Sequence, residues 1–396
     1  MKGYPADPDP YPNYRWLRAN APACPMGGDT AEESTCFVTS YELVRAGLLD
    51  SRLSSDPRNA AGADPSAPAE RSVLDSDPPD HGRMRRVVNP AFSLTAVDAL
   101  RPTIARICRE AIAGLAGHGR ADLMAEYGLV VPVAVIHEIL GVPPEQRVDP
   151  VLFMDRFWWA AAAREPDPEA AEFIDAYVTR ILEYKRAHPG DDVTTALLRA
   201  LEDGGLRDES ELRGMVTAVL GAGHTTTVPL VSAGIVRMLQ HPAQRAKAMA
   251  DPARWADVVE ELLRHDSVIQ VSTNRYAVED LVIGDVPVPR GGTVLMSFAA
   301  ANRDPARFDD PDVFDMDRPR GGHLAFGHGT HFCLGAHLGR AEAEIALRLL
   351  FETLGDVRLT VPVEDVVWSF GPMLRGPAAI PVTFTPVGGA RQGARA

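Results

Sequence analysis

One cysteine has surroundings that suit redox chemistry. Cys333 lies in the glycine-rich stretch F-G-H-G-T-H-F-C-L-G, residues 326–335, and apolar residues at helical spacing follow from Ala336 to Leu350. A cysteine at a helix N-terminus is favoured as the thiolate, because the helix dipole stabilises negative charge there. The neighbouring glycines let backbone amides approach the sulfur closely. A thiolate held by such donors suits the axial position of a haem iron.

The pattern around this cysteine resembles the haem-ligand motif of the cytochrome P450 family. That motif reads F-x-x-G-x-[HR]-x-C-x-G, and the chain fits it at Phe326, Gly329, His331, Cys333 and Gly335. A lone cysteine is more often an inert buried thiol, but other motifs of the family follow in the right order along nearly the whole chain. The resemblance implies haem b as the cofactor and Cys333 as its thiolate ligand. It also implies haem contacts for Phe326, Gly327, His331 and Gly335.

Basic residues elsewhere could hold the carboxylates of such a cofactor. After the two prolines that follow Asp77, a predicted helix places His81 and Arg85 at i and i+4 on one face. Two donors on one face suit an anion, although a basic helix face is more often merely solvated. The resemblance to the H-x-x-x-R motif of P450s implies that both residues hold a haem propionate. It implies the same role for Arg275, together with His331.

A long predicted helix from Asp208 to Leu239 contains the sequence G-A-G-H-T-T-T-V-P, residues 221–229. Glycine and threonine are poor helix formers, and threonine hydroxyls compete for backbone carbonyls, so we expect a local break. The stretch resembles the A-G-x-[DE]-T motif, which handles dioxygen in P450s. The resemblance implies that Ala222 borders the haem and that Gly223, Thr225 and Thr226 form the catalytic part of the helix.

Thr225 departs from this motif, because it stands where the family has an acid. A hydroxyl passes a hydrogen bond but does not hold charge near neutral pH, so protons must travel through water, Thr226 or the substrate. Pro229 cannot donate a hydrogen bond to the carbonyl of Thr225, four residues earlier. We expect this carbonyl to be free to hold a relay water.

The resemblance also assigns structural and substrate-binding positions. Glu261 and Arg264 lie at i and i+3 on one helix face and can pair; with Arg318 they resemble the buried E-x-x-R/arginine cluster that braces the haem loop in P450s. Residues 268–273 alternate in polarity, which predicts a strand. The loop 56–71 resembles the lid of the substrate pocket. The pocket itself is expected to include Trp158, Val268, Ile269, Val271, Met373 and Leu374.

Composition bounds the fold and the partners. The 396 residues contain no linker-like break, so we expect a single domain, 1–396. The resemblance implies the mostly α P450 fold, a triangular prism with minor β-sheets. The net charge of −14 disfavours nucleic acid and anionic membranes as partners. There is no long apolar run, and the four cysteines form no C-x-x-C pair, which fits a cytoplasmic protein.

These features together predict a monomeric haem-thiolate monooxygenase acting on a small molecule of secondary metabolism. Since no electron-transfer domain is recognisable, electrons are expected from ferredoxin and ferredoxin reductase, docked on a basic surface that includes Arg83, Arg86 and Arg340. Two alternatives remain at this stage. One is oxidative coupling or ring formation without oxygen insertion, which the missing acid favours. The other is a haem-binding module that docks a partner without chemistry.

Overall fold

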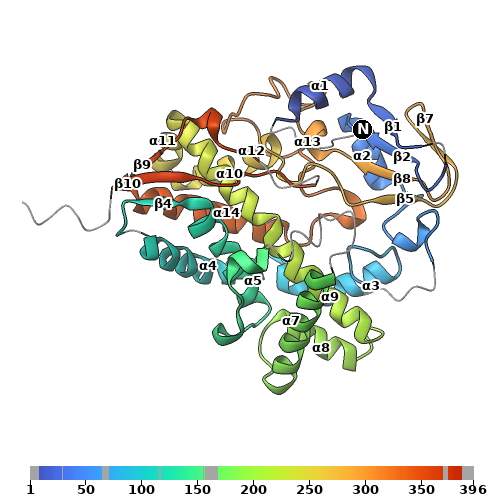
Figure 1. The fold of residues 1–396 in the computed structure, drawn as a ribbon, viewed down its shortest axis with the longest axis horizontal. Helices are drawn as coiled ribbons and strands as arrows, with labels where there is room; N and C mark the ends of the chain where they lie inside the picture. Colours follow the sequence, from blue (N-terminus) through green and yellow to red (C-terminus); the bar gives the residue numbers. More distant parts are fainter. Residues whose placement is uncertain are drawn as a thin grey trace, which may run out of the picture.

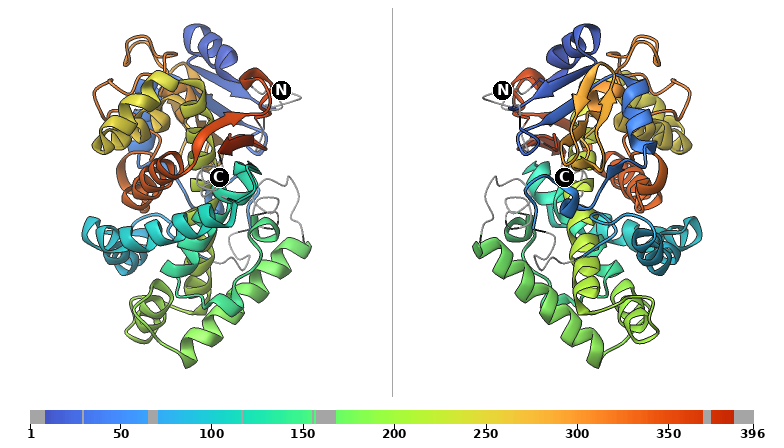
Figure 2. Two further views of the ribbon diagram at one scale, coloured as in Figure 1. Left: turned by 90° about the vertical axis from the view of Figure 1, so that its left-hand side faces the viewer. Right: turned by 90° about the vertical axis from the view of Figure 1, so that its right-hand side faces the viewer.

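The structure is a computed structural model, and it describes residues 9–28, 30–64, 71–115, 117–154, 156, 168–368 and 373–385. Helices dominate these ranges, as Figures 1 and 2 show. The helices are α1 (Tyr11–Asn20), α2 (Tyr41–Leu49), α3 (Asp80–Val88), α4 (Leu94–Leu115), α5 (Val130–Ile139), α7 (Pro168–Ala187), α8 (Val193–Glu202), α9 (Glu209–Thr225), α10 (Thr227–Gln240), α11 (Pro242–Ala250), α12 (Trp255–His265), α13 (Phe298–Ala301) and α14 (Ala336–Thr353).

The strands form two small sheets and a hairpin. The larger sheet has the order β1-β2-β8-β5-β3, in which β2 and β8 run parallel and the other pairs are antiparallel. The smaller sheet has the order β4-β10-β9, and β6 and β7 pair as the hairpin. The strands are β1 (Ala23–Met26), β2 (Thr35–Val38), β3 (Leu53–Ser54), β4 (Arg120–Asp122), β5 (Arg275–Ala277), β6 (Leu281–Ile283), β7 (Val286–Val288), β8 (Thr293–Met296), β9 (Gly355–Leu359) and β10 (Pro381–Thr385). In Figure 1, β4, β9 and β10 lie on the left of the molecule, and β1, β2, β5, β7 and β8 lie on the right. This mostly helical architecture with minor sheets confirms the predicted fold class.

The helix that follows Cys333 is held by the largest hydrophobic core. α14 packs against α4, α10 and α12, and its apolar residues are buried as their helical spacing predicts. Burial of apolar surface is the main stabilising term in such a core. Because α14 is fixed along most of its length, the loop that leads into it starts from a rigid support.

The predicted long helix crosses the centre of the molecule as α9 and α10 (Figure 1). It is interrupted at Thr226, which confirms the break expected from the glycines and threonines around it. By length and composition, the stretch Glu209–Gln240 could cross a membrane, but 72% of its most apolar window is buried inside the protein. This burial is what a core helix requires.

The predicted strand over residues 268–273 is wrong. The segment makes two isolated bridges instead, from Ile269 to Leu374 and from Val271 to Ser297. Since its two partners are different segments, no continuous ladder of hydrogen bonds forms. The alternation in polarity reflects burial against separate neighbours.

Candidate active site

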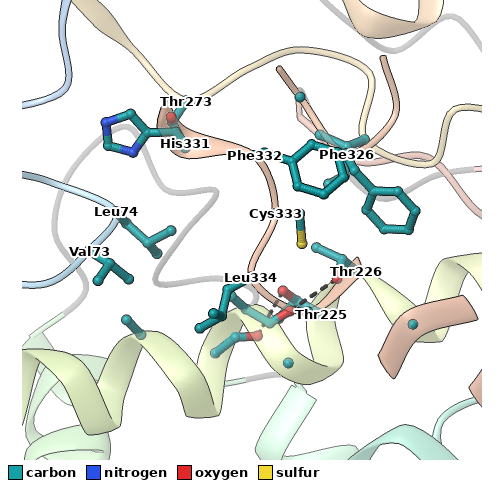
Figure 3. Close-up of a pocket in the computed structure, with 18 of the residues that line it drawn as sticks. Val73, Leu74, Thr225, Thr226, Thr273, Phe326, His331, Phe332, Cys333 and Leu334 are labelled. Atoms are coloured by element: carbon teal, nitrogen blue, oxygen red, sulfur yellow. Dashed lines mark hydrogen bonds between the residues drawn. The ribbon is translucent and has the colours of Figure 1, made fainter. Parts of the chain in front are cut away.

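A cavity of about 690 Å³ lies between the α9–α10 helix and the loop that carries Cys333. Its walls come from segments far apart in the chain: the loop 72–75, helix α9, residues 268–275, the loop 325–335, and Met373 with Leu374. Figure 3 shows the sulfur of Cys333 pointing toward the helix that carries Thr225 and Thr226. The cavity therefore brings the two motifs singled out in the sequence face to face.

The cysteine loop is shaped by two glycines in the left-handed region. Gly327 and Gly329 have φ angles of 70° and 75°, which glycine adopts at little cost. At Gly329 a Cβ would also lie 3.0 Å from the carbonyl oxygen of Leu48. The backbone N–H of Cys333 donates to the carbonyl of Phe326 over 2.9 Å and closes the loop. This geometry directs the sulfur into the cavity.

The environment of the sulfur has opposing effects on its charge. Burial raises the pKa of Cys333, whereas a hydrogen bond from the backbone of Gly335 and the charges of Arg85 and Arg340 act in the opposite direction. The residue has surface open to the cavity although it lies deep inside the protein. A metal ion bound on the cavity side would remove the proton outright. Cys333 would therefore be a thiolate when a cation binds on the cavity side.

Basic side chains gather at one edge of the cavity. Arg275 is 7% exposed and donates to Thr273 Oγ1 over 2.7 Å and to the Asn274 carbonyl over 3.1 Å. No carboxylate of the described residues lies within 4.0 Å of its guanidinium. Burial lowers the pKa of Arg275. An anion from outside the chain would offset the free-energy cost of burying a cation that has no ion-pair partner.

Two histidines lie at the same edge. The rings of His81 and His331 are 4.3 Å apart, and His331 Nε2 is 3.0 Å from the hydroxyl of Ser55. Burial lowers the pKa of His81, and it lowers the pKa of His331 to about 4. Both shifts favour the neutral form of the imidazole ring.

Arg85 has contacts that the sequence did not suggest. Its guanidinium donates to the carbonyls of Thr330, at 3.1 Å, and Phe332, at 2.6 Å. It also lines the cavity. Arg85 thus ties α3 to the cysteine loop, whereas its role at a propionate stays a prediction.

The three threonines at the helix break bond back to the helix. Thr225 donates to the carbonyl of Gly221 over 2.9 Å, Thr226 to that of Ala222 over 3.0 Å, and Thr227 to that of Gly223 over 3.3 Å. All three line the cavity; Thr225 and Thr226 are partly exposed, and Thr227 is buried. These side-chain bonds satisfy carbonyls at the end of α9 and explain how the helix can break here.

Gly223 has a packing reason to be glycine. A Cβ at this position would lie 2.3 Å from Ile136 Cδ1, on α5. The absent side chain therefore lets α9 approach α5 closely. The predicted catalytic role of Gly223 is indirect in this geometry, because the residue positions the helix face that lines the cavity.

We expect Gly223→Ala to lower the free energy of unfolding by about 1–3 kcal/mol, the usual cost of overpacking a core. The added methyl group must push Ile136 or the helix aside. Urea unfolding measures the change. Gly114→Ala in α4 is the matched control, since its Cβ would meet nothing within 4 Å and alanine is the better helix former. Equal stability changes in the two variants would contradict the packing explanation.

The predicted substrate-pocket residues fall into three groups. Val268, Ile269, Met373 and Leu374 line the cavity, as expected. Val271 does not: it is 3% exposed and packs in a separate cluster with Tyr11, Tyr14 and Phe37. Its side chain points away because the chain pairs with the end of β8 at this residue. Trp158 lies outside the described residues.

Other lining residues were missed by sequence reasoning. They belong to the loop before α3 and to the helices α7 and α9: Ser72, Val73, Leu74, Asp75, Ile174, Gly214, Thr217 and Ala218. The one sequence signal for the loop residues is their place just before the Asp77-Pro-Pro helix start. Those on α9 lie about two to three helical turns before Thr225, on the face that meets the cavity.

The predicted structural cluster is assembled as expected from the motifs. Arg264 donates to both carboxylate oxygens of Glu261, at 2.6 and 2.7 Å, and each side chain is 3% exposed. Arg318 approaches the same carboxylate at 3.5 Å. Arg264 also donates to the carbonyls of Asn302, Pro311 and Val313. The cluster joins α12 to the segment that precedes the cysteine loop.

Comparison with known proteins decides the family. A family model described as cytochrome P450 matches residues 256–355. Over 381 residues, 95% of this chain and 91% of the relative, the sequence is 39% identical to the cytochrome P450 monooxygenase PikC of Streptomyces venezuelae. The chain belongs to the cytochrome P450 family.

Solved P450 structures agree with this assignment. The tirandamycin C-bound P450 monooxygenase TamI superimposes with a TM-score of 0.85 at 36% identity, covering 95% of this chain and 97% of TamI. The P450 enzyme CxnD, described as acting in C–S bond formation in chuangxinmycin biosynthesis, gives 0.85 at 31% identity over 96% of each chain. This P450 is an oxidoreductase of the monooxygenase type, so the alternative of a docking module without chemistry is wrong.

The residues around the cavity fit the haem that a P450 carries. Haem bound by a cysteine thiolate is the cofactor of this family. The P450 described here offers a cysteine sulfur open to the cavity, and at one edge it offers a buried arginine without a carboxylate partner among the described residues. A dianionic, flat, apolar ring system with a metal at its centre would satisfy both features.

Proposed function

We propose that this P450 inserts one oxygen atom of dioxygen into a small organic substrate, in the hydroxylation or epoxidation of a secondary metabolite. The observation that carries the proposal is the position of Cys333, whose sulfur opens into the cavity opposite Thr226. Haem, when bound, supplies the activation of dioxygen. Cys333 is proposed as its metal ligand, with Arg275, His81, Arg85 and His331 at the propionates.

Several residues that line the cavity would position the substrate. Val268, Ile269, Met373 and Leu374 present apolar surface to the cavity, together with Val73 and Leu74. Apolar walls hold an organic molecule by excluding water. Excluding water also strengthens the few polar interactions inside the site. The substrate is therefore proposed to be largely apolar.

Thr226 is proposed to deliver or hold protons for the oxygen chemistry. Its hydroxyl is open to the cavity and donates to the carbonyl of Ala222. A hydroxyl is both donor and acceptor, so it can pass a proton along without holding a charge. Thr225 has the same chemistry where the family motif has an acid. Proton supply is thus proposed to depend on two hydroxyls and water.

Oxidative coupling without oxygen insertion is the second candidate, and the hydroxyl at Thr225 is the observation that favours it. A relative that forms C–S bonds, CxnD, shares the fold with relatives named as monooxygenases, so overall similarity does not separate the two reactions. Substrates with their own acidic hydrogen need less proton delivery from the protein.

We expect Thr225→Glu to raise the product formed per NAD(P)H consumed if the enzyme inserts oxygen, because a carboxylate with a tuned pKa exchanges protons more readily than a hydroxyl. General acid–base groups raise reaction rates by about 10²–10⁴-fold, so we expect a several-fold change in the product formed per NAD(P)H. The measurement uses both proteins on the true substrate, with labelled dioxygen.

The matched control is Thr225→Val, because valine removes the hydroxyl at nearly constant volume. Thr227→Glu is unsuitable, because Thr227 is buried. Label in the product supports insertion, and unlabelled coupled product overturns it. Identical coupling efficiency in Thr225→Glu, Thr225→Val and the wild type would remove Thr225 from the proton route.

A redox partner supplies the electrons, as in the bacterial relatives, and we propose ferredoxin with ferredoxin reductase. The expected basic surface is smaller than the sequence suggests. Arg83 pairs with Glu211 and Asp80, and Arg340 pairs with Glu260. Arg86 is exposed on α3 and has no ion pair with a described residue. It is the arginine of the three that is best placed to meet an acidic partner.

The remaining assignments are proposed on the same basis. The cavity takes residues from Leu48 to Leu374, which supports one domain over 1–396. We also propose a cytoplasmic monomer that acts on a small-molecule substrate, in line with the bacterial P450 relatives.

A further inference from the structure

The cavity has one acidic side chain among its described lining residues. Asp75 lies in the loop before α3, between the apolar Leu74 and the buried Ser76. The other charged or titratable side chains on the described wall are Cys333, proposed as the haem ligand, the residues proposed for the propionates (His81, Arg85, Arg275 and His331), and His328 of the cysteine loop. Asp75 therefore stands apart from the machinery already described.

The loop holds Asp75 in place. Ser72, 3% exposed, donates its hydroxyl to Asp75 Oδ2 over 3.0 Å and accepts the backbone N–H of Leu74 over 3.1 Å. On the other side, Asp77 accepts the backbone N–H of Ser55 over 2.9 Å. With both flanks tied to the protein, the carboxyl of Asp75 presents a defined direction to the cavity.

The carboxyl of Asp75 lacks a cationic partner. None of the described arginines, lysines or histidines lies within 4.0 Å of it, and Arg275 uses its donors on Thr273 and Asn274. Burial raises the pKa of Asp75, whereas the hydrogen bond from Ser72 and the more distant charge of Arg275 act in the opposite direction. The residue lines the cavity. A carboxyl on a mostly apolar wall is costly to ionise alone, and a cation beside it removes that cost.

We propose that Asp75 binds a cationic group of the substrate, so that this P450 acts on lipophilic amines. The inference rests on the proposed function, since propionates on Arg275 would leave Asp75 as the remaining site for a positive charge. Val73, Leu74, Val268 and Ile269 cover the apolar part of such a molecule. Figure 3 shows Val73 and Leu74 on the side of Cys333 opposite Phe326, beside the space that the substrate would fill.

Matched probes test the charge preference. Decyltrimethylammonium, decan-1-ol and decanoate share an alkyl chain, and the quaternary nitrogen cannot coordinate iron. Binding to the ferric holoenzyme is followed by calorimetry and by the Soret shift. We expect the ammonium probe to bind about tenfold or more tighter than the alcohol, with decanoate the weakest, because close charge pairs in sheltered sites contribute at least this much.

Variants assign the preference to Asp75. Asp75→Asn should make the ammonium and alcohol probes equal, and Asp75→Glu should keep the preference. Asp98→Asn is the control, because Asp98 pairs with Arg101 on α4 and does not line the cavity. Lack of ammonium preference in the wild type overturns the proposal, as does its persistence in Asp75→Asn. The carbon monoxide spectrum of the wild type tests the haem-thiolate function separately, so the two failures are distinguishable.

Discussion

Reduced Cys333→Ser protein exposed to carbon monoxide is expected to lack the red-shifted Soret band of thiolate-ligated haem. Serine keeps the size of the side chain but does not provide a thiolate, which donates electron density to the iron and favours cleavage of the O–O bond. At metal sites, loss of a residue that hydrogen-bonds to a ligand already lowers metal affinity or activity about 10–100-fold. Loss of the ligand itself should therefore reduce activity by about 100-fold or more.

The control for this variant is Cys24→Ser. Cys24 is half-buried in β1, outside the described lining of the cavity. It should keep both the band and the activity. A thiolate-type band that survives in Cys333→Ser and disappears in Cys24→Ser would overturn the assignment of the ligand.

Arg264→Ala is expected to destabilise the protein by about 3–5 kcal/mol, enough to prevent much of it from accumulating folded. The substitution leaves the buried carboxylate of Glu261 with the backbone N–H of Asp315, at 2.9 Å, and with Arg318, at 3.5 Å, as its remaining partners. It also removes the donor to three backbone carbonyls, which lie in the segment leading to the cysteine loop. Unpaired buried polar groups carry their full cost of desolvation.

Urea unfolding and the fraction of protein with the thiolate-type carbon monoxide band measure this effect. Arg106→Ala is the control, because the Arg106–Glu110 pair on α4 is half exposed or more, with side-chain exposures of 50% and 62%. Exposed pairs of this kind contribute little. Similar unfolding midpoints for Arg264→Ala and Arg106→Ala would show that the buried cluster does not stabilise the fold.

Most features that were predicted from the sequence belong to local motifs. The spacing of Cys333 and its glycines, the break at Thr226, and the pair of Glu261 and Arg264 depend on residues within one turn or loop of one another. Such features need only local geometry, and the sequence displays them directly. The mostly helical fold followed from the same periodicities.

Features that depend on distant segments were not predictable in this way. Val271 was assigned to the pocket from the family resemblance, but pairing with Ser297 places its side chain in another cluster. Arg83 looked free for a docking surface until the chain brought Glu211 beside it. Asp75 gained significance only when the loop before α3 was placed on the cavity wall. In each case the deciding neighbour is tens to more than a hundred residues away in sequence.

The back-bonded threonines have a consequence for how a substrate enters. Carbonyls at a helix break normally attract tightly held water, and an apolar guest that displaces such water loses its hydrogen bonds. Here the carbonyls of Gly221, Ala222 and Gly223 already accept side-chain hydroxyls. At the helix break, side-chain hydroxyls therefore take the place of bound water at these carbonyls. An apolar molecule can pack against the break with a small dehydration penalty.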